Sequence, residues 1–509
     1  MKKIIFLIIA ASFITISCKR DFDEPNPNQA TISSFWKTSD DAIQGVNAIY
    51  STFHRGAAGF SRVIFFHGNL RGDEGYGSGG DGGLNTLMSF SMDDPNFWMT
   101  ADMWDNLYVG IYRANQVIAF VPNIQMDADL KRRLVGEAKF LRGLFYYYLT
   151  LYYGRPALVL EPSQPTMQPR NATSEEAWAQ VAKDFTEATA DLPTSYGSAD
   201  LGRATKGAAY AFLGKTYLQQ KKYAEAATAF AWLVTGPGAA LYDLMPNYRD
   251  NFLITSENNK ESVFEIQNMR KDDENGDDDI RSDIRMNTGA SISKFFAPSG
   301  PGFQDGAARR WVVNEFHLEK TATGQRDPRL AATFLYDSTD IGGPNVTMVY
   351  GRTWASRYGL TNSMVFYRKL LNDHWRDDER FNSPNNYRVV RFADVLLLYA
   401  EALNGQGQTA AAYPFVDRVR ERAGLRKLSV AMPGLSQAQF LQQLKHERIT
   451  ELSGEAWRFA DLARWGDLNP TLQTRDAEFR NFIVGKHELY PIPRRDIDLN
   501  PNLTQNPNY

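Results

Sequence analysis

The 509-residue sequence contains one cysteine, Cys18, and only six histidines. A single cysteine cannot form an internal disulfide, and the histidines show no metal-ligand spacing. The nucleophile motif Gly-x-Ser-x-Gly and the zinc motif His-Glu-x-x-His are both absent. The sequence therefore predicts a protein that is not an enzyme and needs no cofactor. A pair of catalytic carboxylates for glycoside hydrolysis stays open, because their separation is set in space and not in sequence.

The sequence also has no excess of positive charge, since 56 Lys and Arg stand against 59 Asp and Glu and the formal net charge is −3. A protein that binds nucleic acid is usually basic, so we expect no nucleic-acid partner. Aromatic residues, in contrast, are abundant, with 10 Trp, 24 Tyr and 31 Phe. Such a supply fills a large core and also suits a surface that holds flat, partly apolar ligands.

The N-terminus has the pattern of a secretory leader. Two lysines at 2–3 precede an apolar run at 4–16, which is shorter than the roughly 20 residues that span a bilayer. The run ends just before Cys18, so we predict a signal peptide over residues 1–17 and a lipid on Cys18. Residues 18–30 are polar and interrupted by proline, which predicts a lipidated tether. A plain exported or unprocessed segment is the alternative.

Helical periodicity dominates the first half and the last third of the sequence. Apolar residues recur at steps of three and four from Leu134 to Tyr152 and stop before Gly154, which predicts a central helix. Three further helices are expected, at 392–403, 411–423 and 440–465. Between residues 239 and 384 the helical rhythm fades, and only two short segments, 262–267 and 364–369, are candidate strands.

The helical region contains a tetratricopeptide-like signature. Its small-residue and large-residue positions are Tyr210, Leu213, Gly214, Tyr217, Ala226 and Phe230, and a weaker match runs from Leu396 to Val416. We predict a mostly α fold, a scaffold of tetratricopeptide-like helix pairs with long irregular loops and a few short strands. It forms a single domain over 31–509, with an N-terminal helical part at 31–238, a loop-rich insert at 239–384 and a C-terminal helical part at 385–509.

Candidate ligand-binding residues lie in two irregular regions. The glycine-rich segment 68–83 is interpreted as a flexible surface loop, and Trp98 as a loop residue outside the helix of Trp104. In the insert, aromatic and basic side chains could stack on and hydrogen-bond to a sugar. The candidates are Arg71, Asp73, Tyr76, Trp98, Arg309, Trp311, Trp354, Tyr358 and Trp375. For each Trp, packing inside a loop is an equal alternative.

Two charged clusters invite other interpretations. The acidic run 272–279 has oxygens that suit calcium, but its glycine does not fit a calcium-binding loop, so a solvated loop is favoured and a structural calcium ion stays open. The C-terminal charged residues recur on a helix with apolar neighbours, and we interpret them as a structural ion-pair and packing network. They are Glu455, Arg458, Asp461, Arg464 and Trp465.

Several short motifs, in a fixed order, resemble the SusD/RagB family of nutrient-binding outer-membrane lipoproteins. They are Glu-Ala-Lys-Phe-Leu-Arg-Gly at 137–143, Asp-Pro-Arg-Leu at 327–330, Arg-Phe-Ala-Asp-Val-Leu-Leu-Leu-Tyr-Ala-Glu-Ala-Leu-Asn at 391–404, Glu-Ala-Trp-Arg-Phe-Ala-Asp-Leu-Ala-Arg-Trp-Gly at 455–466 and Leu-Tyr-Pro-Ile-Pro at 489–493. Ala456 and Asn508 stand where the family commonly has glycine.

The resemblance implies a helical protein whose long loops form one ligand-binding face. Such a protein lies as a lid on a SusC-like TonB-dependent transporter and delivers an oligosaccharide or polysaccharide to it. A peptide or glycopeptide ligand is the alternative, and a surface glycoside hydrolase is a less favoured one. The resemblance also implies attachment to the outer membrane through the lipid, facing the cell exterior, because acidic residues after Cys18 resemble the surface-export signal of the Bacteroidetes.

Overall fold

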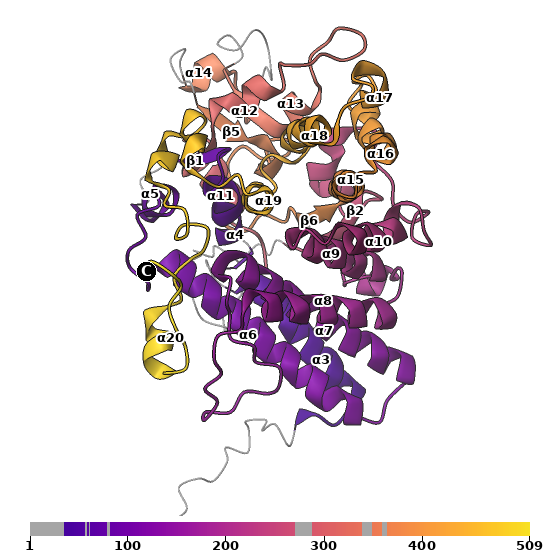
Figure 1. The fold of residues 1–509 in the computed structure, drawn as a ribbon, viewed down its shortest axis with the longest axis vertical. Coiled ribbons are helices and arrows are strands. Elements are labelled where there is room, and N and C mark those ends of the chain that lie inside the picture. The colour runs from indigo at the N-terminus through magenta and orange to yellow at the C-terminus, as the bar shows by residue number, and fades with distance from the viewer. Residues whose placement is uncertain are drawn as a thin grey trace, which may run out of the picture.

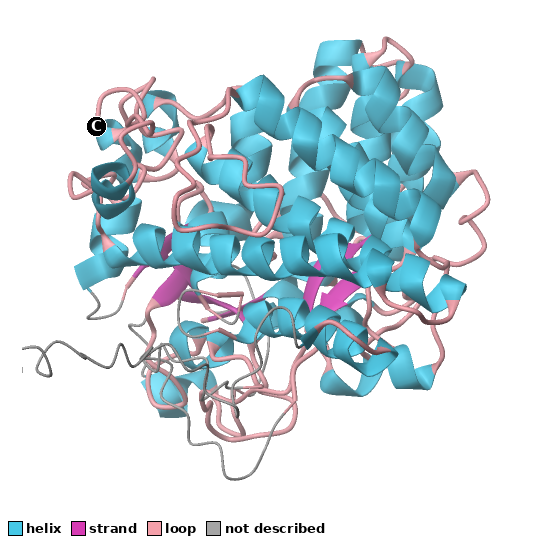
Figure 2. Ribbon diagram, turned by 90° about the horizontal axis from the view of Figure 1, so that it is seen from below, coloured by secondary structure: helices cyan, strands magenta, loops and turns pink. Residues whose placement is uncertain are grey.

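A computed structural model describes residues 35–55, 59–60, 62–78, 82–269, 288–337, 349–358 and 364–509. The fold is mostly helical, with most of the long helices in the lower and right parts of the view and many of the short helices toward the top (Figure 1). Figure 2 shows that only a few short strands lie among the helices. The predicted leader, the tether with Cys18 and the acidic run 272–279 lie outside the described residues.

The long helices form two groups. The N-terminal helices are α3 (Ser39–Tyr50), α6 (Trp98–Phe120), α7 (Ala128–Tyr153), α8 (Ser174–Asp191), α9 (Lys206–Gln219) and α10 (Tyr223–Val234). The C-terminal helices are α15 (Phe392–Gly405), α16 (Thr409–Arg422), α18 (Gln437–Leu452) and α19 (Arg458–Trp465). Capping boxes at Thr38, Thr173 and Ser436 fix the starts of α3, α8 and α18.

Shorter elements connect these helices. The short helices are α4 (Val63–Phe65), α5 (Gly82–Met88), α11 (Ile292–Phe296), α12 (Arg310–Glu315), α13 (Arg329–Thr333), α14 (Trp354–Tyr358), α17 (Leu428–Ala431) and α20 (Arg494–Leu499). A π-helical turn, η2, covers Phe66–Leu70. The 3-10 turns are η1 (Ser51–His54), η3 (Val121–Asn123), η4 (Ser198–Asp200), η5 (Tyr248–Phe252), η6 (Ile254–Ser256), η7 (Arg368–Leu370), η8 (Pro470–Thr474) and η9 (Ala477–Asn481).

Helix α7 is the central helix that the sequence predicts. Its N-cap is Asp127, whose side chain accepts two backbone N–H groups, and it ends at Gly154 with φ +71°. All residues from Phe140 to Tyr153 are buried, so the helix is enclosed over its whole C-terminal half. Only an element with neighbours on every side can be apolar around its circumference, and α6 and α8 pack against it.

The tetratricopeptide-like interpretation is confirmed in the packing of α9 on α10. A Cβ added to Gly214 would lie 2.5 Å from the ring of Phe230, so only glycine allows this approach. Helix α10 packs in turn against α15, which pairs with α16. The two helix pairs are therefore neighbours in space although the insert separates them in sequence, and one hydrophobic cluster extends from Ala42 to Ile492.

Within the described ranges, six short strands form three two-stranded antiparallel sheets. Strand β1 (Gly75–Gly77) pairs with β3 (Gly306–Ala308), β2 (Ser262–Ile266) with β6 (Tyr387–Arg391), and β4 (Phe334–Tyr336) with β5 (Val365–Tyr367). The predicted strand at 262–267 is confirmed as β2. The second predicted strand is shorter than expected, because the chain turns into η7 after Tyr367.

Two expectations about helix boundaries were wrong. Trp98 does not lie in a loop; it is the first residue of α6. The expected helix at 440–465 is two helices, α18 and α19, because the backbone between them is left-handed at Gly454 (φ +85°) and Ala456 (φ +65°). Asn508 is also left-handed (φ +67°), so both positions where the family commonly has glycine need this conformation.

A buried network of charges joins the insert to the C-terminal helices. The guanidinium group of Arg391 pairs with the carboxylates of Glu261 at 2.5 Å, Glu455 at 2.7 Å and Glu451 at 3.0 Å. The predicted network on α19 is confirmed: Arg464 pairs with Glu401 at 2.7 Å, and Arg458 with Asp73 at 2.6 Å. Each of these arginines is nearly or fully buried, so each is matched by a carboxylate.

Candidate ligand-binding surface

The pairing of β1 with β3 brings the early glycine-rich segment against the insert. Tyr76 lies opposite Ala307, and the N–H of Ser78 donates to the carbonyl of Asp305 at 2.8 Å. Side chains alternate along a strand, so Tyr76 and Ser78 point to the outer face while Gly75 and Gly77 face the interior. A Cβ on Gly75 would lie 2.8 Å from the carbonyl of Asn69, which explains why glycine holds this position.

Basic and aromatic side chains gather beside this strand pair. The guanidinium group of Arg309 lies 4.4 Å from the ring centre of Tyr76 and pairs with Asp476 at 2.6 Å. The indole N–H of Trp311 donates to the carbonyl of Asp73 at 2.6 Å, and Arg475 lies 4.5 Å above the Trp311 ring. Burial raises the pKa of Tyr76 although Arg309 opposes this effect. The phenol therefore stays neutral, able to donate a hydrogen bond.

Phe303 presents an aromatic ring at the end of the same strand pair, with 47% of its surface exposed. The backbone at this turn is fixed by two hydrogen bonds. The N–H of Phe303 donates to the carbonyl of Lys294 at 2.8 Å, and the N–H of Gln304 donates to the carbonyl of Ala297 at 2.9 Å. Gln304 is left-handed at φ +64°, a conformation that costs a non-glycine residue about 1–3 kcal/mol. The fold thus leaves about half of this ring in solvent, while the rings of Phe295 and Phe381 pack against it and the ammonium group of Lys294 lies 4.9 Å from its centre.

Trp98 is linked to Phe303 through a series of ring contacts. The guanidinium group of Arg62 lies 5.3 Å from the Trp98 ring and 4.2 Å from the Phe295 ring. The Phe295 ring in turn lies 5.6 Å from the ring of Phe303. We use the name β1–β3 surface for the half-buried or exposed side chains of this region, which are Tyr76, Trp98, Phe303, Arg309, Trp311 and Arg475.

Two of the candidate residues are interior, which corrects their expected place on a surface loop. Arg71 is fully buried, with its guanidinium group 4.1 Å from the Tyr490 ring and donating to the carbonyl of His487. Asp73 is fully buried as well and pairs with Arg458. Burial alone raises the pKa of Asp73, but the guanidinium groups of Arg458 and Arg475 hold it below its usual value. Both side chains serve the packing of the chain.

The other three candidates lie on later segments of the insert, one of which is hydrogen-bonded to the turn that carries Phe303. Trp354 is 6% exposed, and its ring packs against Tyr358 at 4.8 Å. The indole N–H of Trp375 donates to Asn372 at 3.1 Å. Glu379, a few residues later, donates its N–H to Pro301 in the turn at 2.9 Å. Trp354 thus follows the packing alternative, and we leave these three residues outside the β1–β3 surface.

The sequence interpretation missed Phe303 and Arg475. A signal for Phe303 exists in the run Ser-Gly-Pro-Gly-Phe at 299–303, because an apolar residue directly after such a turn has no helix stripe or strand face to join. Arg475 carries no comparable local signal. It reaches the surface only because the chain after α19 folds back onto Trp311 and Asp73.

Among the described residues, one group of side chains has the spacing of metal ligands. Glu319, His446 and Glu447 place ligand-type atoms within 4.8 Å of one another. Arg420 already pairs with Glu319 at 2.6 Å and with Glu447, so a guanidinium group lies where a metal ion would contact both carboxylates. The group is therefore an ion-pair cluster. In the same described ranges, no helix has the length and apolarity needed to cross a bilayer.

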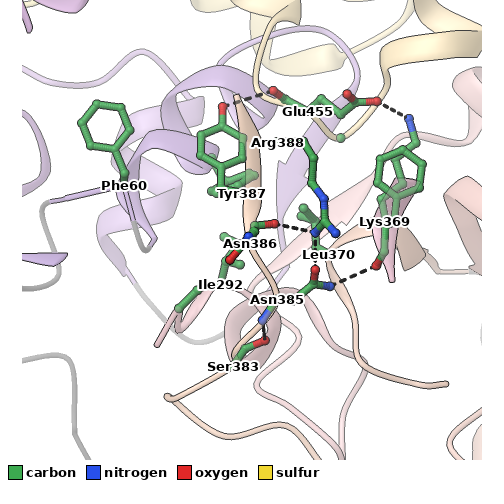
Figure 3. Close-up of a pocket in the computed structure, with 14 residues that line it drawn as sticks. Phe60, Ile292, Lys369, Leu370, Ser383, Asn385, Asn386, Tyr387, Arg388 and Glu455 are labelled. Atoms are coloured by element: carbon green, nitrogen blue, oxygen red, sulfur yellow. Dashed lines mark hydrogen bonds and ion pairs between the residues drawn. The ribbon is translucent and has the colours of Figure 1, made fainter. Parts of the chain in front are cut away.

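A small cavity lies in the interior between the insert and β6. Figure 3 shows Lys369 and Tyr387 pointing toward Glu455, and Arg388 toward Asn385. The ammonium group of Lys369 lies 2.8 Å from Glu455, and burial lowers the pKa of this lysine to about 8. With a volume of about 40 Å³, the cavity has room for a few water molecules but not for a sugar chain.

Comparisons with known proteins agree with this architecture. A family model described as "SusD family" matches residues 260–509, and one described as "Starch-binding associating with outer membrane" matches residues 88–218. The SusD-like protein P25 of Formosa agariphila is 24% identical over 543 residues, covering 98% of this chain and 97% of that protein.

Solved structures give the same result. The crystal structure of a SusD superfamily protein from Bacteroides vulgatus is 26% identical, with a TM-score of 0.80, and covers 93% of this chain and 100% of its own. A structure described as a laminarin-binding SusD-like protein is also 26% identical, with a TM-score of 0.75 and the same coverage. The chain is a SusD-like protein.

Proposed function

We propose that this protein binds an oligosaccharide noncovalently at the β1–β3 surface. The observation that carries the proposal is the fixed ring of Phe303, which keeps 47% of its surface exposed on a surface that also presents the half-exposed guanidinium group of Arg475. Aromatic faces stack on the C–H faces of pyranose rings, and guanidinium and phenol groups hydrogen-bond to hydroxyls. The laminarin-binding SusD-like neighbour supports a glycan as ligand, and a peptide or glycopeptide is the second candidate.

Binding without catalysis is the function that the carboxylates of this surface support. Asp476 is paired with Arg309, and Asp73 with Arg458 and Arg475. A glycosidase needs one carboxyl group free to protonate the leaving oxygen and a second that is free to attack or to activate water. Both carboxylates here are held by guanidinium groups, so a surface glycoside hydrolase is the weaker proposal.

Delivery to a transporter completes the proposed function. In this proposal a lipid on Cys18 attaches the protein to the outer membrane, facing the cell exterior, and the protein passes its glycan to a SusC-like TonB-dependent transporter. The leader pattern and the family description "associating with outer membrane" support this location. Mass spectrometry of the protein extracted from membranes tests the lipid, and copurification from those membranes tests the transporter.

Affinity electrophoresis and calorimetry with a panel of glycans, laminarin and laminarihexaose included, test the binding step. Phe303→Ala should weaken the affinity about 3- to 10-fold, since a ring contact contributes about 0.5–1.5 kcal/mol. Phe303→Tyr keeps the ring and should bind like the unaltered protein. The matched control is Val430→Ala, because Val430 is an exposed apolar side chain (69%) that does not belong to the β1–β3 surface. Equal affinity of the Ala variant at Phe303 and the unaltered protein, or release of reducing sugar, would overturn the proposal.

A further inference from the structure

We propose that a second oligosaccharide site lies in a groove between α6, the segment 157–169 and α20, which we call the α6–α20 groove. Its volume is about 670 Å³, within the range of small-molecule sites. None of its lining residues belongs to the β1–β3 surface. In Figure 1, α20 lies beside α6 at the lower left of the molecule. This site rests on the proposed oligosaccharide binding and extends it to a second place.

One wall of the groove is aromatic. Tyr108 and Tyr112 follow each other by one turn of α6, and Tyr112 is 41% exposed. The Tyr108 ring is fixed, because its hydroxyl donates to the carbonyl of Ala157 at 2.8 Å and its ring lies 4.8 Å from Trp104. On the C-terminal wall, Leu499 is 78% exposed. These groups offer a flat apolar face of the kind that stacks on a pyranose.

Polar groups alternate with this apolar lining. Asp105 and Asp496 line the groove, and Arg495 pairs with both, with its Nε 3.5 Å from Asp496. The exposed side chain of Gln168 lies on the segment opposite. Arg495 balances one of these two negative charges, and both carboxylates keep acceptor positions. Such a lining favours a neutral ligand with many hydroxyls over an anionic one.

Hydrogen bonds fix the position of the segment 157–169, which forms the third wall. Two buried side chains of the helices bind the carbonyl of Val159, Asn115 at 2.8 Å and Tyr146 at 2.9 Å. From the C-terminal side, Asn500 donates to Pro169 at 2.8 Å and Asn502 to Gln168 at 2.7 Å. A long irregular segment fixed in this way needs little ordering on binding, which favours affinity.

The helix that forms the groove also connects it to the β1–β3 surface. Trp98 and Tyr112 are 14 residues apart, which places them on the same side of α6, about 21 Å apart along its axis. A long glycan stacked on Trp98 can therefore reach the groove. An apolar protein segment in the groove is the competing occupant, but it would take water away from the carboxylates of Asp105 and Asp496, whose pairing with Arg495 leaves acceptor positions on both, and this desolvation is costly.

Calorimetry and saturation-transfer NMR with the full chain in detergent test the second site. The probe is the hexasaccharide that binds most tightly in the panel described above, laminarihexaose included. We expect two hexasaccharides per chain, and one per chain for Tyr112→Ala. Tyr112→Phe, which keeps the ring, should still bind two. In a Phe303→Ala background, which keeps a weakened first site, adding Tyr112→Ala should remove the saturation-transfer signal of the second site, while thermal unfolding stays the same.

A polysaccharide of the same sugar sharpens the test. If one chain engages both places, Tyr112→Ala should weaken polysaccharide binding more than hexasaccharide binding, about tenfold or more through lost avidity. One hexasaccharide per unaltered chain, or equal stoichiometry for Tyr112→Ala and the unaltered protein, would overturn the second site while leaving the β1–β3 surface intact. Protection of the groove by a copurified protein, with no sugar bound there, would favour the apolar partner instead. Failure of the proposed function would give a different result, because Phe303→Ala would then leave the glycan affinity unchanged.

Discussion

The helix pairs and the β1–β3 surface are built in opposite ways from the same chain. In the helix pairs, contacts form mainly between neighbours in sequence, as where Gly214 admits the ring of Phe230 sixteen positions later. In the β1–β3 surface, Tyr76 meets Arg309 and Trp311 meets Arg475, partners that lie far apart in the chain. The scaffold is therefore local and apolar, and the candidate site is distant in sequence, charged and partly exposed. The comparison teaches that stability and ligand binding can be altered separately.

The largest effect should come from the buried charge network that joins the insert to the C-terminal helices. Arg391→Met removes the guanidinium group that pairs with Glu261, Glu451 and Glu455, all of them buried. Breaking a buried ion pair costs about 3–5 kcal/mol, because the remaining charge has no water. We expect the free energy of unfolding, measured in urea, to fall by that amount.

The matched control for this variant is Arg418→Met. Arg418 pairs with Asp243 at 3.0 Å, but both side chains are well exposed, so the change should be below about 1 kcal/mol. Equal losses for the two variants would contradict the view that the buried network, and not the number of ion pairs, connects the insert to the helices.

The scaffold is the part that the sequence predicts well. The spacing in α7 and its end at Gly154 follow from helix geometry alone, and the same holds for α9 and α10. The β1–β3 pairing could not be predicted, because strands of three residues are too short to show an alternating pattern. Nothing local indicates which distant segment completes such a pair.

The glycine-rich segment was misread for a related reason. Its glycines were interpreted as flexibility, but several of them serve close packing. A Cβ on Gly68 would lie 2.3 Å from the carbonyl of Ala456, and one on Gly72 would lie 2.9 Å from the side chain of Arg458. Glycine permits a loop and a tight backbone contact equally, so composition alone cannot distinguish them. Arg71 and Asp73 were placed on the surface as a consequence.

A pH titration of Glu74 should sharpen the comparison next. This buried carboxyl belongs to the residue directly before β1, and burial raises its pKa from 4.5 to about 7, although Arg458 opposes this. The folded protein then binds the proton more tightly than the unfolded chain does. The contribution of Glu74 to the free energy of unfolding is therefore complete below about pH 4.5. It falls by about 3 kcal/mol in total as the pH rises to about 7.

Glu74→Gln removes this titration. The stability of the variant relative to the unaltered protein should therefore increase between pH 4.5 and 7 and stay constant above pH 7, as measured by urea unfolding at each pH. Glu257, whose pKa burial also raises to about 7, titrates in both proteins and cancels in the difference. A difference that does not change with pH would mean that Glu74 is ionised in the folded protein throughout.

The smallest effect on stability should separate two arginines that share one carboxylate. Arg458 is buried and binds Asp73 through two nitrogens, at 2.6 and 2.9 Å, whereas Arg475 has 44% of its side chain exposed and lies 3.1 Å from the same group. Arg475→Gln leaves Asp73 paired, so the free energy of unfolding should change by less than about 1 kcal/mol. Glycan affinity should fall about fivefold, because a charged donor is lost. Arg458→Gln should instead lower the free energy of unfolding and leave glycan affinity unchanged, because it leaves a buried carboxylate without its main partner. If Arg475→Gln lowers stability as much as Arg458→Gln and leaves calorimetric affinity unchanged, Arg475 belongs to the scaffold and the β1–β3 surface ends at Trp311.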